Sequence, residues 1–135
     1  MSKYYWERGE SSVAYIDTAR RLSMRIKLSC ANANHKKFTF YGLQDVSKYS
    51  SELVRLCSQI NRLNMADLGE AKRRQMLTRE ARGLLDTLAT LFGESATIIQ
   101  FSEGVLQEVS DLMALEDKLL AGLQKSDAER IRKLR

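Results

Sequence analysis

Residues 70–99 have the sequence EAKRRQMLTREARGLLDTLATLFGESATII and repeat apolar or small side chains at alternating steps of three and four. This spacing places those side chains on one face of an α-helix, in the pattern of a bundle seam. No proline interrupts the stretch, and a proline inside a helix would cost about 3 kcal/mol. The stretch therefore predicts one long amphipathic helix. Its expected apolar stripe comprises Leu77, Ala81, Leu84, Leu88, Leu91, Ser95 and Ile98.

Three further stretches share this rhythm, at residues 12–33, 39–64 and 102–124. Weak breakers separate them, and the whole chain contains no proline. Helices joined by short connections pack antiparallel to their neighbours. We therefore predict a single all-α domain over residues 1–135, an antiparallel up-down-up-down four-helix bundle with a short basic C-terminal tail at residues 125–135. The apolar face expected of the last helix comprises Val105, Val109, Leu112, Leu115, Leu119 and Leu123.

The composition is that of a globular protein, with 44% hydrophobic and 29% charged residues in a chain of 135. No segment approaches the roughly 18–20 consecutive apolar residues that span a bilayer. Residues 1–10 lack the apolar run of a secretory signal. The two cysteines, Cys30 and Cys57, lack a metal-ligand spacing and are expected to be reduced core thiols. These observations predict a cytoplasmic protein that does not associate with membranes.

The net charge of +5 is unevenly distributed along the sequence. Residues 18–44 contain no acid, whereas residues 83–117 contain no lysine or arginine. In an up-down bundle, the start of the third helix and the end of the fourth lie together, so one end is expected to be basic. At the other end a basic corner and an acidic corner are expected on different surfaces. Such head-to-tail complementarity favours rings or filaments, and we expect a cyclic homo-oligomer.

Arginines dominate the basic segments, and two interpretations of them remain open. They can be ordinary solvated faces, or they can bind phosphate groups through their forked donors. The second interpretation requires that they are not neutralised one by one by carboxylates of the same subunit. No recognition-helix, zinc-finger or aromatic RNA-binding signature is present, so contact with backbone and shape is expected. The primary candidates are Arg73, Arg74, Arg79 and Arg82, and the secondary candidates are Arg20, Arg21, Arg25, Lys36 and Lys37.

Catalytic signatures are missing from the sequence. The only histidine, His35, lies in a lysine-flanked turn, and the glycines do not form a phosphate-binding loop. We therefore expect a protein that is not an enzyme and needs no metal or cofactor. Glu116 falls near the seam of the last helix, where it is expected either to have an arginine partner, to lie at an interface, or to be a surface residue beside the seam.

Several short segments resemble the accessory variability determinant (Avd-like) proteins of diversity-generating retroelements. These segments are Lys36–Gly42, Ile60–Asn64, Arg73–Leu77, Leu84–Leu88 and Glu116–Asp127. The resemblance implies a non-enzymatic four-helix bundle that forms a pentameric barrel with a basic surface and binds nucleic acid. It also implies association with a reverse transcriptase and support of mutagenic copying of template RNA into cDNA. The alternative from another class is a helical adaptor that binds only proteins.

Overall fold

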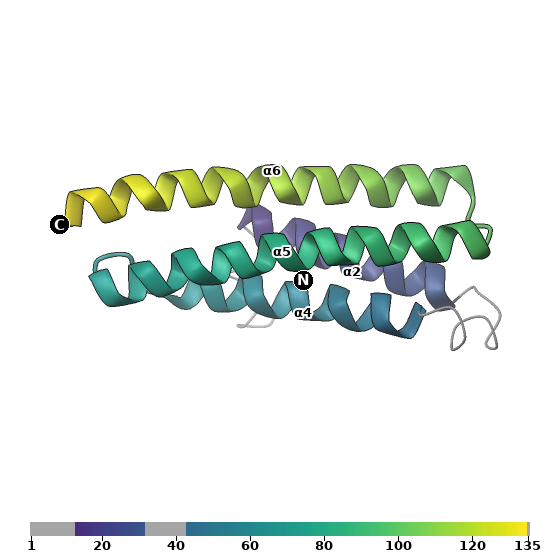
Figure 1. Cartoon of the computed structure of the whole chain (residues 1–135), viewed down its shortest axis with the longest axis horizontal. Helices are drawn as coiled ribbons and strands as arrows, with labels where there is room; N and C mark the ends of the chain where they lie inside the picture. The colour runs from purple at the N-terminus through teal and green to yellow at the C-terminus, as the bar shows by residue number, and fades with distance from the viewer. Residues whose placement is uncertain (1–12, 32–42, 135) are drawn as a thin grey trace, which may run out of the picture.

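The computed structural model describes residues 13–31 and 43–134. Within these ranges the chain forms the helices α2 (Ala14–Ala31), α4 (Leu43–Arg62), α5 (Leu68–Ile98) and α6 (Glu103–Leu134), and no strand. Consecutive helices run in opposite directions along one long axis (Figure 1). The predicted all-α four-helix bundle is confirmed.

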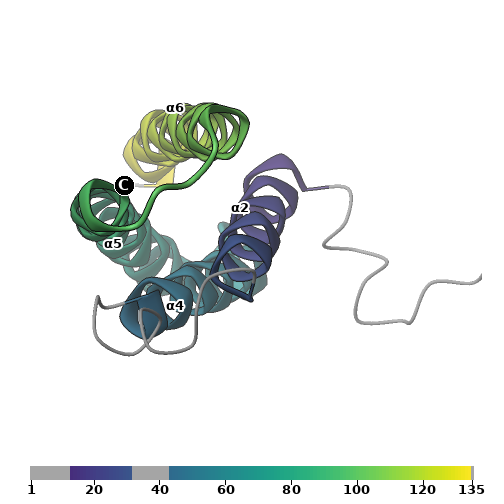
Figure 2. The same ribbon diagram turned by 90° about the vertical axis from the view of Figure 1, so that its right-hand side faces the viewer.

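Each of the four helices packs against two neighbours around one core. α2 packs against α4, α4 against α5, α5 against α6, and α6 returns to α2. The end-on view shows the same order (Figure 2). α5 and α6 are the longest helices, and their paired ends extend past the first residues of α2 (Figure 1). The start of α5 and the end of α6 therefore lie together, as the sequence predicts.

Capping side chains set the boundaries of the two long helices. The Asp67 carboxylate accepts a hydrogen bond from the backbone N–H of Glu70 at 2.9 Å, so α5 begins slightly earlier than the predicted residue 70. The Ser102 hydroxyl accepts one from the backbone N–H of Val105 at 3.2 Å and starts α6 where predicted. Five residues join α4 to α5 and four join α5 to α6, and such short connections enforce the antiparallel order of these helices.

The last helix is longer than predicted, and the tail is helical, one of the two states, helical or frayed, that the sequence leaves open. α6 does not end at residue 124 but continues to Leu134. The physical reason is that the buried seam continues: Leu120, Asp127 and Ile131 are all buried. Steps of seven and four keep these residues on one face, so the segment packs as a helix.

The core corrects the predicted stripes of α5 and α6. On α2, Ile16, Leu22 and Ile26 are fully buried. Ile98 and Leu115 are 51% and 45% exposed, contrary to the prediction. The core-facing stripes of α5 and α6 are rotated relative to the predicted ones. On α5 the buried residues are Ala71, Thr78, Ala81, Leu85, Leu88, Phe92 and Ser95. On α6 they are Val109, Glu116, Leu120, Asp127 and Ile131.

Both cysteines are buried and free, as predicted. The Cys30 thiol lies 3.8 Å from the backbone carbonyl of Leu43, across the pair formed by α2 and α4. Burial raises the pKa of Cys30 to about 11. None of the helices that the structure describes combines the length and the apolarity needed to cross a bilayer.

Candidate nucleic-acid interface

The four predicted arginines of α5 divide into two pairs with different surroundings. Arg74 and Arg82 face α6, eight residues apart on one side of the helix. Arg74 Nε donates to Asp127 Oδ2 at 2.8 Å. Arg82 donates to Asp117 Oδ1 at 3.2 Å and to Gln124 Oε1 at 2.9 Å. These two arginines join α5 to α6. Their guanidinium groups already bond to side chains of α6, whereas the sequence suggested that they would bind phosphate groups.

Two secondary candidates of α2 also have carboxylate partners. Arg25 Nε lies 2.7 Å from Glu108 Oε2 of α6, although its N–H is not aligned for a regular hydrogen bond. Arg21 pairs with Asp17 one turn earlier at 2.9 Å. The expectation that the counter-charges lie elsewhere is therefore wrong for Arg21 and Arg25, as it is for Arg74 and Arg82. Glu108 and Asp117 belong to the acidic segment of α6, which packs against α2 and α5. The partner of Arg74, Asp127, lies further along α6, and the partner of Arg21, Asp17, lies on α2 itself.

The remaining candidates have mixed positions. Arg73 and Arg79 are exposed on the outer side of α5, whereas Arg20 of α2 is half-buried. Lys36 and Lys37 lie outside the described residues. The structure therefore does not bring the seven described candidates into one site, and it separates the arginines of α5 from those of α2.

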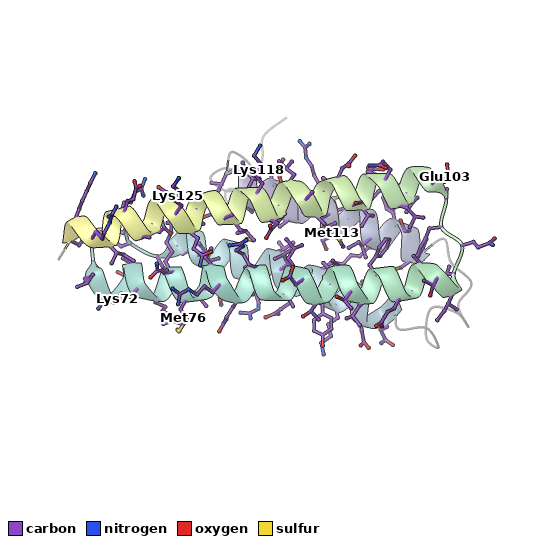
Figure 3. All side chains as sticks on the ribbon, turned by 45° about the horizontal axis from the view of Figure 1, so that its top comes forward. Lys72, Met76, Glu103, Met113, Lys118 and Lys125 are labelled. Carbon is purple, nitrogen blue, oxygen red and sulfur yellow. The ribbon has the colours of Figure 1, made fainter. Side chains whose placement is uncertain are left out.

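A basic surface does remain at the end shared by α5 and α6. Its members are all exposed, and none forms an ion pair with a carboxylate among residues 13–31 and 43–134. Lys72 and Lys125, one from each helix, mark this end in Figure 3. We call it the basic end, and it comprises Lys72, Arg73, Arg79, Lys125, Arg130, Arg132 and Lys133.

The α6 part of the basic end was absent from the predicted site. Its lysines and arginines were visible as a charged C-terminal segment, but the helix was expected to stop before them. Ile131 was the available signal, because it continues the spacing of Leu120 and is buried. Arg132 and Lys133 also lie in the last turn, where positive charge stabilises the helix C-terminus. Part of this positive charge therefore stabilises the C-terminus of α6.

A buried polar cluster lies inside the bundle near Arg74. The Arg74 and Asp127 side chains are 12% and 1% exposed. Burial raises the pKa of Tyr15 to about 12, and the nearby positive charge of Arg74 opposes that rise. The Tyr15 hydroxyl also donates to the Asn61 side chain at 3.4 Å. Asp127 Oδ1 has no hydrogen-bond partner among the described residues. The ion pair of Arg74 is therefore part of the interior of the molecule.

Glu116 lies in the core with a thiol as its neighbour, in contrast to the predicted alternatives. It is fully buried, and Cys57 donates a hydrogen bond from its thiol to Glu116 Oε2 at 3.8 Å. Glu116 Oε1 has no hydrogen-bond partner among the described residues. Burial raises the pKa of Glu116 to about 8, despite an opposing contribution from the thiol hydrogen bond. Its carboxyl group is therefore largely protonated at neutral pH, which lowers the cost of burying it.

Cys57 is not in the environment of an activated nucleophile. Burial, followed by the neighbouring charge of Glu116, raises the pKa of its thiol well above the ordinary range. A reactive cysteine needs the opposite shift. In the part of the chain that the structure describes, no three metal-ligating side chains gather into a metal site.

Comparison of the chain with protein-family models, curated proteins and solved structures found no match. We therefore classify the protein by the arrangement of its helices. It belongs to the structural class of antiparallel four-helix bundles, with a buried polar cluster between its helices and an exposed basic end.

Proposed function

We propose that this protein is a non-enzymatic accessory protein that binds nucleic acid through the basic end. The observation that carries the proposal is the exposure of Arg73, Arg79 and the α6 residues of that end without carboxylate partners among the described residues. Arginine and lysine in this state can neutralise phosphates and release counterions. The sequence has no recognition-helix, zinc-finger or aromatic RNA-binding signature, so weakly sequence-selective binding is expected.

The resemblance to Avd-like proteins extends the proposal. We infer a ring of identical subunits, cytoplasmic in location, that assists a reverse transcriptase in mutagenic copying of template RNA. The position of Glu103 supports an assembly through opposite charges, because it is exposed at the end of the bundle away from the basic end (Figure 3). Glu94 is also exposed, close to the C-terminal end of α5. The internal pairing of Arg25 with Glu108 reduces the charge left for such contacts. A ring would repeat the basic end and raise its affinity for a polyanion.

Reversing Arg73 and Arg79 together, as Arg73→Glu and Arg79→Glu, is expected to weaken binding to RNA by about 10²-fold at about 50 mM salt. The dependence of log K on log salt should become shallower by about two, because two phosphate contacts are lost. The measurement is fluorescence anisotropy with a labelled single-stranded RNA of about 30 nucleotides and a DNA duplex of matching sequence.

The matched control carries Lys48→Glu and Lys118→Glu, which change the net charge equally at exposed sites away from the basic end. It should retain most of the affinity. Equal losses in both double variants would mean that net charge and not this surface governs binding. If the wild-type protein binds neither RNA nor DNA in this assay at about 50 mM salt, a helical adaptor that binds only proteins becomes the better assignment.

A further inference from the structure

A small polar pocket lies between α5 and α6, next to the basic end. Its volume is about 290 Å³, close to the lower limit of roughly 300 Å³ for ligand pockets. The lining residues are Arg79, Arg82, Gly83, Asp86, Asp117 and Gln124. Every one of them except Gly83 has a charged or polar side chain, so the pocket suits a small polar group. Because Arg79 belongs to both the pocket and the basic end, a polyanion bound at the basic end also reaches the pocket.

Two side chains of the pocket are available to a ligand. Arg82 already bonds to Asp117 at 3.2 Å and to Gln124 at 2.9 Å. The side chains of Arg79 and Asp86 form neither an ion pair nor a hydrogen bond with any described residue. They are seven residues apart, which places them on the same side of α5 and about 10 Å apart along its axis. The pocket therefore offers hydrogen-bond donors at one end and a carboxylate acceptor at the other.

Gly83 leaves room for a flat ligand between these two side chains. A Cβ atom added at Gly83 would meet no atom within 4 Å, so the space above the backbone of α5 is open. The guanidinium of Arg82 is held by its two bonds to α6 beside this space. A fixed guanidinium plane is a surface on which a nucleobase can stack.

The free groups identify the chemistry of the ligand, which needs acceptors for Arg79 and N–H donors for Asp86. Guanine has both: its N1–H and N2–H groups lie side by side and suit one carboxylate, and its O6 and N7 atoms accept from arginine. A phosphate group alone fits less well, because Asp86 would repel it. Pairing with cytosine occupies the N1–H and N2–H groups, so the guanine has to be unpaired.

We propose that this pocket binds one unpaired guanine of a single-stranded nucleic acid whose phosphates lie on the basic end. Asp86 accepts from the N1–H and N2–H groups, Arg79 donates to the opposite edge, and the base lies over Gly83. This inference rests on the proposed function and adds a preference for single strands and for one base. Recognition of a single base is compatible with weak sequence selectivity elsewhere along the strand.

The probe is a fluorescein-labelled oligouridine of about 8 nucleotides with one guanine at its centre. Comparison oligonucleotides carry adenine, uracil or inosine at that position, and inosine lacks the N2 amino group of guanine. Anisotropy titrations at about 50 mM salt should show about tenfold tighter binding of the guanine oligonucleotide than of the adenine or uracil one. Inosine should give an intermediate affinity. In a hairpin stem, exchanging one G·C pair for an A·U pair should leave binding unchanged.

Gly83→Leu fills the pocket without removing any charge. Its affinity for the guanine oligonucleotide should fall about tenfold, to that of oligouridine, while binding of oligouridine itself is unchanged. The matched control is Gly93→Leu, because an added Cβ at Gly93 of the same helix also meets no atom within 4 Å. It should retain the preference for guanine. Circular dichroism melting should show both variants at least as stable as the wild type, because leucine favours a helix more than glycine does.

Asp86→Asn tests the recognition of the base edge. The asparagine side chain replaces one acceptor oxygen with a donor, so the variant should lose the preference for guanine and bind the adenine oligonucleotide better than the wild type does. The matched control is Glu80→Gln, which changes the net charge equally at an exposed position of α5 outside the pocket. It should keep the preference for guanine.

The outcomes separate this inference from the proposed function. Equal binding of the guanine and adenine oligonucleotides by the wild type, or a guanine preference that survives Gly83→Leu, would overturn the pocket assignment, whereas binding of oligouridine would still support the basic end. If free guanosine monophosphate binds as tightly as the guanine oligonucleotide, the ligand is a nucleotide and not a strand, and the inference is wrong. If no oligonucleotide binds at all, the proposed function and this inference both fail.

Discussion

Replacing Arg74 with methionine is expected to lower the free energy of unfolding by about 3–5 kcal/mol. Arg74 donates to Asp127, and the Asp127 side chain is only 1% exposed. Its second oxygen, Oδ1, already lacks a hydrogen-bond partner among the described residues. Removing the guanidinium would therefore leave a buried carboxylate with no compensation. Urea unfolding followed by circular dichroism measures the loss.

A second variant separates the charge from the packing. Arg74→Met combined with Asp127→Leu removes both members of the pair and fills the space with apolar atoms. Because burying an ion pair costs desolvation energy, the double variant should recover most or all of the lost stability. If it is as unstable as Arg74→Met alone, the ion pair itself and not the unpaired carboxylate determines the effect.

Arg82→Met is the matched control on the same helix. Arg82 also bonds to a carboxylate of α6, but the Arg82 and Asp117 side chains are 38% and 48% exposed. Exposed ion pairs contribute about 0–1 kcal/mol, so this variant should be only slightly destabilised. A loss as large as that of Arg74→Met would contradict the distinction between buried and exposed pairs. The comparison also separates Arg74, whose role is structural, from Arg73, which we assign to nucleic-acid binding.

The periodic pattern was sufficient to predict the bundle, because apolar spacing and the absence of proline leave few alternatives. It was less reliable for the orientation of α6. Leu115 and Leu119 form one plausible stripe, whereas the true core stripe includes Glu116 and Asp127. A carboxylate at a seam position looks like a surface residue until its partner is known. The partners, Cys57 and Arg74, lie on other helices and far away in sequence.

The candidate site was harder to predict than the fold. Arg73 and Arg74 are adjacent in sequence, but their side chains point about 100° apart around the helix. One is exposed, and the other is bonded to α6. Only the packing of α5 against α6 decides which is which, and no local pattern encodes that register. The number of basic residues in a stretch of sequence is therefore larger than the number whose charge is available on the surface.

The buried carboxyl group of Glu116 is expected to make the bundle less stable as the pH rises. Burial raises its pKa from 4.5 to about 8 in the folded state. The unfolded chain retains the ordinary value, so between pH 4.5 and 8 the folded state binds the additional proton. The stabilising contribution is fully present below pH 4.5 and is lost as the pH rises through 8. The loss is on the order of 5 kcal/mol, measurable from urea unfolding at a series of pH values.

Glu116→Gln tests the origin of this dependence, because glutamine has nearly the same shape and cannot ionise. The variant should lose most of the pH dependence and exceed the wild type in stability at pH 9. The groups that face Glu116 do not provide another source: Tyr15 of α2 and Cys57 of α4 have raised pKa values and keep their protons over this range. Arg74 of α5 and its partner Asp127 of α6 belong to the same buried cluster around Tyr15.

Glu129→Gln is the matched control, because Glu129 is exposed on the same helix and its substitution changes the net charge equally. Its stability profile should run parallel to that of the wild type. Parallel profiles for Glu116→Gln as well would mean that Glu116 ionises in contact with water. The carboxyl group would then not occupy the core between α4 and α6, and its hydrogen bond from Cys57 would have to be abandoned. A profile flattened only by Glu116→Gln would instead locate the pH sensitivity of the bundle in this one buried group.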